Sequence, residues 1–293
     1  PLCFTNNGST GPKMEYQTGA GAFIVSNVVT LASDALIGGN AFSGGALALA
    51  GIVTNRGTLV KRGSWTLALN NAKNVFTGPV VVDSPDGMLR LEADALKGPG
   101  SVTVSNGTLA LAFTVTSEYF ANNQNNRRML VTGGGSLWSN SSSVAYFGVA
   151  GGSTTNASLT VDGGKLITPA ILVGYNGSGG YNSLVISNGG QVFATLNPSY
   201  VGLGTPGNTA VITGTNSLWN QVSSMIVGSA ATGTSLRVEK GGALNVSYAS
   251  SGAALAIGAS GGQSNALTIA SPSSGIMRVT KTFGFKASLL GGK

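Results

Sequence analysis

One group of carboxylates lies close together in the sequence and is the first candidate for chemistry. Its members, out of nine acidic residues in all, are Asp83, Asp86, Glu92 and Asp94. Clustered carboxylates bind metal ions or supply the acid and the base for cleavage of polysaccharides. The run Asp83-Ser-Pro-Asp86-Gly87, however, is typical of a turn in which Asp side chains bond their own backbone. We therefore predict a turn, with a carbohydrate or calcium site as the alternative.

A serine motif is the second candidate. Gly258-Ala-Ser-Gly-Gly262 matches the G-x-S-x-G pattern of serine hydrolases. The chain contains no His, so the usual Ser-His-Asp activation of the serine cannot operate. We predict a loop at this position and no enzymatic activity. No catalytic, cofactor-binding or metal-binding residue is predicted, and no cofactor is expected.

Aromatic and amide side chains could bind sugars. Trp138 and Trp219 take equivalent places in a repeated phrase, which favours a structural role over sugar stacking for them and for Trp65. The Asn-rich segments 122–126 and 176–180 are predicted to be solvated turns, with a ligand or partner surface as the alternative. Six N-x-S/T triplets are interpreted as coincidences of composition, and they begin at Asn7, Asn106, Asn140, Asn156, Asn176 and Asn245.

Composition limits the classes of protein that fit. The 293 residues include 46 Gly, and 42% are hydrophobic but only 9% charged, which excludes a disordered chain. The net charge of +7 is scattered rather than clustered, so no nucleic-acid partner is expected. No apolar run reaches the length of a membrane-spanning helix. Cys3 is the one cysteine and cannot form an internal disulfide. Because the chain begins at Pro1 without Met, we expect a piece of a longer protein.

Internal repeats in the sequence indicate which secondary-structure elements carry these residues. A phrase of apolar strand followed by Gly-Gly recurs as Leu159–Gly164, Leu184–Gly190 and Leu236–Gly242. The units begin 25 to 31 residues apart, at Met129, Leu159, Leu184, Ala210, Leu236 and Leu267. A second phrase, an apolar run with Gly, recurs at Tyr146–Val149, Ile171–Gly174, Tyr200–Gly202, Met225–Gly228 and Leu255–Gly258. Each unit is thus predicted to hold three short strands separated by turns.

Three strands in about 25 residues form one coil of a parallel β-helix, whose strands pair with the next coil about 4.8 Å away. Ankyrin-like repeats would show a helical period and propeller blades would be longer, so neither fits. We predict an all-β, right-handed parallel β-helix (β-solenoid) of roughly ten to twelve coils. Inward side chains would be Val, Leu, Ile and Ala, and Gly and Asn would occupy the corners.

The first half carries related phrases, and these resemble a known family. Gly57–Leu69, Phe76–Gly78, Gly87–Leu91 and Gly100–Leu111 resemble the passenger-associated repeat of bacterial autotransporters. Val29–Ile37 resembles the strand that precedes that repeat, so the resemblance covers roughly residues 28–280. It implies an extracellular, bacterial β-helical passenger without fixing an activity. A passenger segment, or a relative that leaves the cell by another route, is expected.

The predicted organisation has four parts. These are an N-terminal strand or partial cap (1–28), coils with the passenger-associated repeat (29–128), coils of 25–31 residues (129–280) and a C-terminal strand or tail (281–293). The predicted function is that of a structural or adhesive protein at the bacterial surface. Expected partners are further copies of the chain, in oligomers or fibres, and surface glycans. The alternative is a carbohydrate-binding or polysaccharide-cleaving β-helix enzyme.

Overall fold

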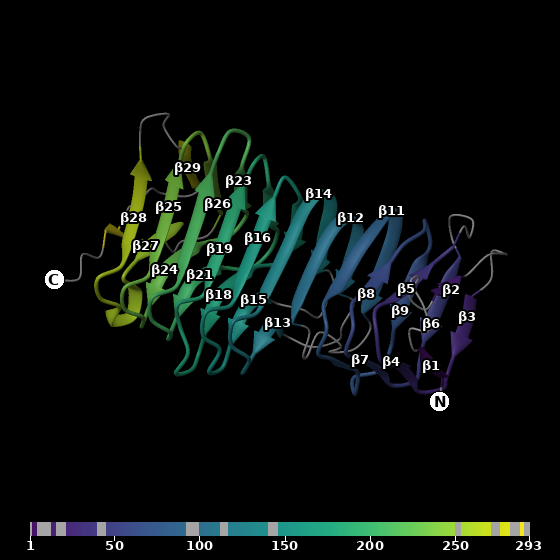
Figure 1. Cartoon of the computed structure of the whole chain (residues 1–293). Coiled ribbons are helices and arrows are strands. Elements are labelled where there is room, and N and C mark those ends of the chain that lie inside the picture. The colour runs from purple at the N-terminus through teal and green to yellow at the C-terminus, as the bar shows by residue number, and fades with distance from the viewer. Residues whose placement is uncertain are drawn as a thin grey trace. The chain divides into compact units, whose positions relative to one another are not determined.

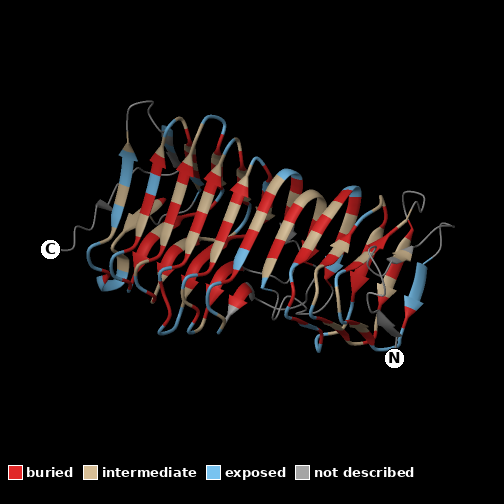
Figure 2. Ribbon diagram, viewed as in Figure 1, coloured by how far each residue is buried: buried red, intermediate tan, exposed pale blue. Residues whose placement is uncertain are grey.

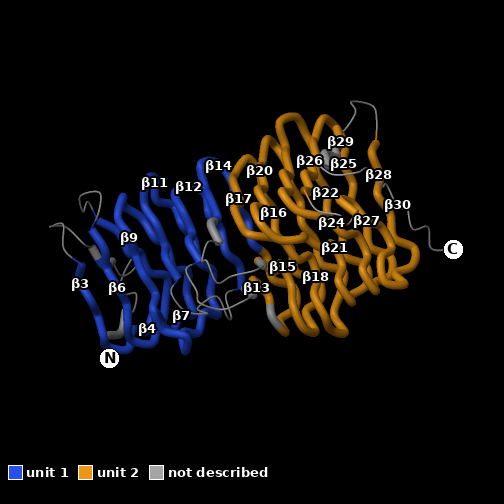
Figure 3. The backbone as a smooth tube through the Cα atoms, turned by 180° about the vertical axis from the view of Figure 1, so that it is seen from behind, with its two compact units in different colours: residues 1–114, 129–143 blue, residues 115–128, 144–293 orange. Residues whose placement is uncertain are grey.

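The computed structural model is a parallel β-solenoid with almost no helix (Figure 1). It describes residues 2–4, 13–15, 22–39, 45–91, 100–111, 117–139, 146–249, 253–270, 276–281 and 288–289. Within these residues one short 3-10 turn, Ala259–Gly261, stands beside the strands. None of the described residues form a helix long and apolar enough to cross a membrane. The chain divides into two compact units, residues 1–114 with 129–143 and residues 115–128 with 144–293 (Figure 3).

Among the described strands of the first unit, pairing is parallel and joins one turn of chain to the next. One sheet stacks β1 (Leu2–Phe4), β4 (Val29–Leu31), β7 (Val53–Asn55) and β10 (Val75–Phe76). A second ladder contains β2 (Lys13–Glu15), β5 (Ala35–Gly38) and β8 (Leu59–Lys61), and a third contains β3 (Ala22–Val25), β6 (Ala46–Leu49) and β9 (Thr66–Leu69). Both ladders continue into β11 (Val80–Leu91), which pairs with β12 (Ser101–Leu111); β14 (Arg128–Ser139) belongs to the same sheet.

The second unit repeats the same arrangement. One sheet stacks β13 (Ser117–Asn122), β15 (Tyr146–Gly151), β18 (Ile171–Tyr175), β21 (Ser199–Leu203), β24 (Met225–Ser229), β27 (Leu255–Ile257) and β30 (Ser288–Leu289). A second ladder runs through β16 (Ser158–Asp162), β19 (Ser183–Ser187), β22 (Thr209–Thr213), β25 (Ser235–Glu239) and β28 (Ala266–Ala270). The third runs through β17 (Lys165–Thr168), β20 (Gln191–Ala194), β23 (Leu218–Gln221), β26 (Ala243–Tyr248) and β29 (Ile276–Lys281).

The core follows from alternation along these short strands (Figure 2). In β16 and β19 every second side chain is buried, as expected for strands with one face toward a lumen. Inward residues stack in register from turn to turn, for example Leu159, Leu184, Ala210 and Leu236, all fully buried. Burial of each Leu side chain contributes about 2 kcal/mol before its conformational entropy is subtracted. The stacked apolar rows therefore hold neighbouring turns together.

The number of regular turns is lower than the ten to twelve that the sequence predicts. About eight turns consist of three separate strands, three in the first unit and five in the second. The difference arises at β11, β12 and β14, each of which continues as one strand of 11 or 12 residues where other turns have two. These strands continue through their corners, and β14 does so even across Gly133–Gly135, so counting repeats by length overestimates the regular turns.

The Val-Gly phrase of the second unit makes room for a polar ladder inside the solenoid. Gly174, Gly202 and Gly228 all have left-handed φ, between 74° and 82°. A Cβ atom on Gly174 would lie 2.5 Å from Asn208 Oδ1, and one on Gly228 would lie 2.1 Å from Asn265 Cγ. Gly is required here for both its backbone conformation and its lack of a side chain. The buried Asn side chains in turn accept hydrogen bonds from backbone N–H groups, such as Asn182 N to Asn208 Oδ1 at 3.0 Å.

Replacing Gly228 by Ala should therefore destabilise the second unit by about 2 kcal/mol, through the left-handed φ and displacement of the Asn265 amide. Gly233→Ala is the matched control, because Gly233 has a similar φ of 67° but no atom within 4 Å of the place that a Cβ would take. Urea unfolding of both variants measures the difference. Equal losses in the two variants would show that the ladder does not depend on the space at Gly228.

Candidate functional site

A polar cavity of about 310 Å³ lies in the first unit, at the corner through which β11, β12 and β14 run. Its walls come from the turn of β11, the middle of β12 and the middle of β14, and the lining residues are Pro85, Asp86, Asn106, Gly107, Thr108, Gly134 and Ser136. Residues 28 or more positions apart along the chain thus meet at one corner, for example Thr108 and Ser136, whose hydroxyls are 2.9 Å apart.

The middle of β11, between Asp83 and Met88, leaves the regular register with β12, which is why a cavity forms here. The register of β11 against β12 shifts between Val82 and Asp83 and again between Asp83 and Met88. Asp86 takes a left-handed φ of 58°, a conformation that Asp tolerates better than most residues. A Cβ atom on Gly107 would lie 2.1 Å from the Ser84 carbonyl oxygen, so only Gly allows β12 to approach this turn.

The four clustered acidic residues do not form one site in the structure. Asp83 forms an ion pair with Arg62 at 3.2 Å and accepts a hydrogen bond from Asn106 Nδ2 at 2.9 Å. Asp86 is exposed and lines the cavity. Glu92 and Asp94 lie outside the described residues. The described residues hold no group of three or more His, Cys, Asp or Glu side chains placed to bind a metal ion.

A buried lysine and serine stand behind this corner, and the sequence did not reveal them. Lys61 is fully buried, in the inward register between Ile37 and Val82. Its Nζ donates to the carbonyl oxygens of Arg62 (2.8 Å) and Gly63 (2.7 Å) and to Ser84 Oγ (3.0 Å). It also lies 4.2 Å from the centre of the Trp65 ring. Burial lowers the pKa of Lys61 from 10.5 to about 7.

A lysine of this kind next to a serine can act as a general base in other proteins. Here Ser84 is fully buried as well, and its hydroxyl also bonds the Gly63 carbonyl oxygen. Neither residue lines the corner cavity. A substrate would therefore need the corner to open before it could reach the serine. The role supported by this geometry is structural: the Lys61 amine donates hydrogen bonds to three oxygen acceptors near the end of β8.

The positions of the tryptophans and of the serine motif favour a structural role over a chemical one. Trp65 and Trp219 are buried, 1% and 0% exposed, so neither ring offers a stacking face to a sugar. The Trp138 side chain is outside the described residues. Ser260 of the G-x-S-x-G motif lies exposed in the 3-10 turn with a left-handed φ of 53°. The motif thus lies in a short exposed turn between strands, where a loop was predicted.

The Asn-rich segment 122–126 forms a ladder with the following turn. Asn156 Nδ2 donates to Asn126 Oδ1 at 2.8 Å, and Asn123 Oδ1 accepts from Ser153 N at 2.9 Å. The left-handed φ values of Asn126 and Asn156, both 59°, identify them as corner residues. In segment 176–180, Asn176 also has a positive φ. The amides therefore support the corners of the solenoid. The side chain of Asn122 is outside the described residues.

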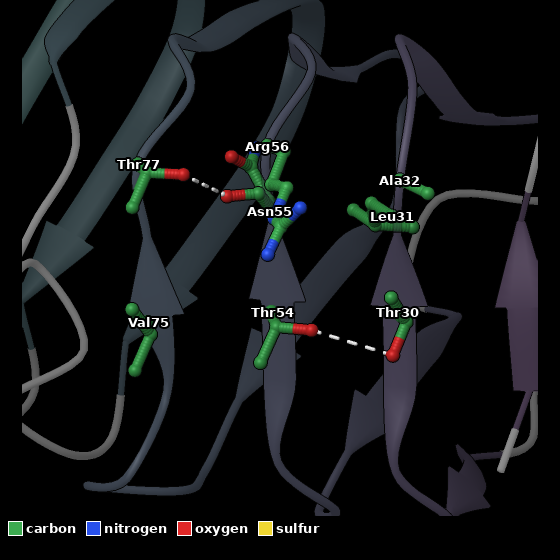
Figure 4. Close-up of a pocket in the computed structure, with 8 residues that line it drawn as sticks. All are labelled: Thr30, Leu31, Ala32, Thr54, Asn55, Arg56, Val75 and Thr77. Atoms are coloured by element: carbon green, nitrogen blue, oxygen red, sulfur yellow. Dashed lines mark hydrogen bonds between the residues drawn. The ribbon is translucent and has the colours of Figure 1, made fainter.

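A second cavity, of about 430 Å³, lies over β4, β7 and β10 of the first unit (Figure 4). Its polar groups bond along the ladder, as in Thr54 Oγ1 to Thr30 Oγ1 at 3.3 Å and Thr77 Oγ1 to the Asn55 carbonyl oxygen at 2.8 Å. Methyl groups of Thr, Ala and Val supply much of the remaining wall. The corner cavity is the better candidate because several unlike polar groups converge on it.

The fold and these surfaces define a parallel β-solenoid with a stacked apolar core, polar corner ladders and a polar corner cavity. No family model matches the sequence, and no curated protein matches it. Among solved structures, the chain is similar to the crystal structure of a TibC-catalysed, hyper-glycosylated TibA fragment, with 11% identity and a TM-score of 0.29. The match covers 91% of this chain and 97% of that one.

Proposed function

We propose that the chain is an extracellular, structural or adhesive segment of a bacterial surface protein of the autotransporter passenger type. The observation that carries the proposal is the repetition of outward side chains in register. Ser158, Ser183, Thr209 and Ser235 occupy one row across four turns of the second unit. Such a row presents similar contacts about every 4.8 Å. Many weak contacts of this kind add up to firm attachment.

The resemblance of residues 28–280 to passenger repeats supports the extracellular location. A solenoid built without disulfides suits that role, because nearest-neighbour stacking supplies its stability. The absence of His from the sequence and the burial of the Lys61–Ser84 pair favour attachment over catalysis. The ion pair of Asp83 with Arg62 also makes Asp83 a poor partner for Asp86 in polysaccharide cleavage.

Self-association is part of the proposal. In β28, Ile269 continues the inward row of Val238 but is 47% exposed, and Ile276 at the start of β29 is 55% exposed. Among the described strands, β28 has a partner, β25, on one side only. An uncovered strand edge with apolar side chains templates further strands. A second copy of the chain would cover it.

Attachment and association are measured on the same purified protein. Beads coated with the chain should bind bacterial or host cells saturably, and sedimentation should show mass that grows with concentration. Ile269→Lys should reduce association, since a charge would then be buried at the edge. Arg278→Lys, on the outward face of β29, is the control. Beads that bind no more cells than albumin-coated beads, together with a monomer at all concentrations, would contradict the proposal.

A further inference from the structure

We propose that the corner cavity bounded by Asp86, Asn106, Thr108 and Ser136 is a binding site for a neutral saccharide. This inference deepens the proposed adhesive function and rests on it. It assigns the recognition to one corner of the first unit, where the solenoid departs from its regular three-strand turns.

The lining supplies acceptors in excess of donors. Within the described part of the chain, the Asp86 carboxylate takes part in no hydrogen bond or ion pair, although Asp86 lines the cavity. Asn106 Nδ2 donates one hydrogen to Asp83, and the Asn106 Oδ1 atom lies beside Gly134, 3.4 Å from the position of a Cβ there. Carboxylate and amide oxygens accept hydrogen bonds from hydroxyl groups. A ligand rich in hydroxyl donors fits this set.

Two hydroxyls on the opposite wall complete the set. Thr108 Oγ1 and Ser136 Oγ are 2.9 Å apart, and Ser136 Oγ also lies 3.5 Å from the Gly107 carbonyl oxygen. Ser136 Oγ donates to the Gly107 carbonyl oxygen, so Thr108 is the donor between the two hydroxyls, and both oxygens keep lone pairs that can accept from a ligand. A sugar ring, whose hydroxyls donate, matches this wall as well as the wall of Asp86 and Asn106.

Charge and size argue against an anion and against calcium as the ligand. Asp86 is the one charged residue among those lining the cavity, so an anion such as phosphate would meet repulsion without a compensating cation. Calcium takes six to eight oxygens, commonly from several carboxylates, and the lining residues supply one carboxylate. A volume of about 310 Å³ is at the lower end of small-ligand sites and suits one or two sugar units.

The backbone supports a specific geometry. Asp86 is held at a left-handed φ by the turn that Gly107 allows β12 to contact. Behind the turn, the buried Ser84 is fixed by Lys61 Nζ. The carboxylate is thus carried by a turn anchored on its inner side, which lowers the entropy cost of binding.

The test uses the full chain and an array of immobilised neutral mono- and oligosaccharides, followed by titration of any sugar that binds. We expect one class of neutral sugar to bind, and Asp86→Asn and Ser136→Ala each to weaken it at least tenfold. Asp34→Asn is the control, since it makes the same charge change in the same unit, at an exposed turn where Asn can still accept from Thr58 N. Its affinity should equal that of the parent chain.

Any one of the following binding results would overturn the assignment: no neutral sugar bound at millimolar concentration, undiminished binding by Asp86→Asn, or calcium binding in a titration with calcium chloride alone that Asp86→Asn abolishes. Circular dichroism and the urea midpoint show whether each variant is folded. Cell attachment that persists in Asp86→Asn would overturn the saccharide site but leave the proposed adhesive function intact. Loss of attachment by the parent chain itself would count against the function.

Discussion

Replacing Asn208 by Leu should destabilise the second unit by about 4 kcal/mol, although the two side chains have similar volumes. Asn208 is fully buried, and its Oδ1 accepts from both the backbone N and Nδ2 of Asn182, each at 3.0 Å. Its Nδ2 donates to the carbonyl oxygen and the hydroxyl of Thr205 at 2.7 and 2.8 Å. Leu would remove the partner of the buried Asn182 N–H and of the Thr205 carbonyl and hydroxyl, at a cost of about 1–3 kcal/mol each, whereas Asn182 Nδ2 keeps the Thr154 carbonyl oxygen.

Urea unfolding measures the total loss, and hydrogen exchange at the Asn182 amide measures it locally. Exchange at that amide should become faster, because its acceptor is removed. Asn220→Leu on the same turn is the control, since Asn220 lies on the outward face of β23 and should change stability little. A loss below 1 kcal/mol, or unaltered exchange at Asn182, would mean that the polar ladder does not hold the turns in register.

The second large effect concerns the dependence of stability on pH. The pKa of Lys61 is about 7 in the folded chain against 10.5 for an unperturbed lysine. Between these values the unfolded chain binds more protons than the folded chain, so stability rises with pH. The gain from Lys61 between pH 6 and pH 10 should be about 4 kcal/mol, and below pH 7 the contribution levels off at its lowest value.

Lys61→Met removes the titrating amine from the same buried register, so the variant should lack this rise. Urea unfolding across the pH range gives the two curves, and their difference cancels the other groups that titrate. The sequence contains no His, which keeps the window from pH 6 to 9 nearly free of other changes. Lys73→Met, at an exposed turn, should retain the parent slope. Parallel curves for the parent and Lys61→Met would show that Lys61 is solvated.

The repeat phrases predicted much of the fold because stacking imposes the same demand on every turn. Leu159, Leu184, Ala210, Leu236 and Leu267, named as unit starts from the sequence, pair in one row. The Gly-Gly turns, as at Gly163 and Gly189, lie between successive strands with left-handed φ. Periodicity and Gly position are local properties, so the sequence carries them directly.

Other features depend on contacts that the sequence does not display. Gly148 has the same phrase as Gly174 but pairs with Leu172, because β15 is offset by two residues in its ladder. Lys61 belongs to an apolar row although its side chain is charged, since its amine reaches three acceptors at a corner. Apart from the position of Lys61 in the register of the strand, nothing in the sequence indicates that this lysine is buried.

The candidate site was predicted in part. The sequence predicts Asp83 and Asp86 together in a turn, whereas the structure continues β11 through both, with a register shift at Asp83 and a left-handed φ at Asp86, and gives them different environments. Asp83 is bound by Arg62 and Asn106, whereas Asp86 faces the cavity. The opposite wall comes from Ser136, 50 residues beyond Asp86 in the sequence. Ser136 comes close to Asp86 because β11, β12 and β14 continue past the corner as long strands. The repeat count did not predict these long strands.

We propose that this solenoid attaches through its outer surface and does not cleave what it binds. One assay on a polysaccharide-coated surface tests it, by measuring retained protein and released reducing sugar together. We predict saturable retention with no sugar released, and the same retention for Ser84→Ala, whose hydroxyl is buried. Sugar released by the parent chain, and reduced in Ser84→Ala or Asp86→Asn, would contradict the account.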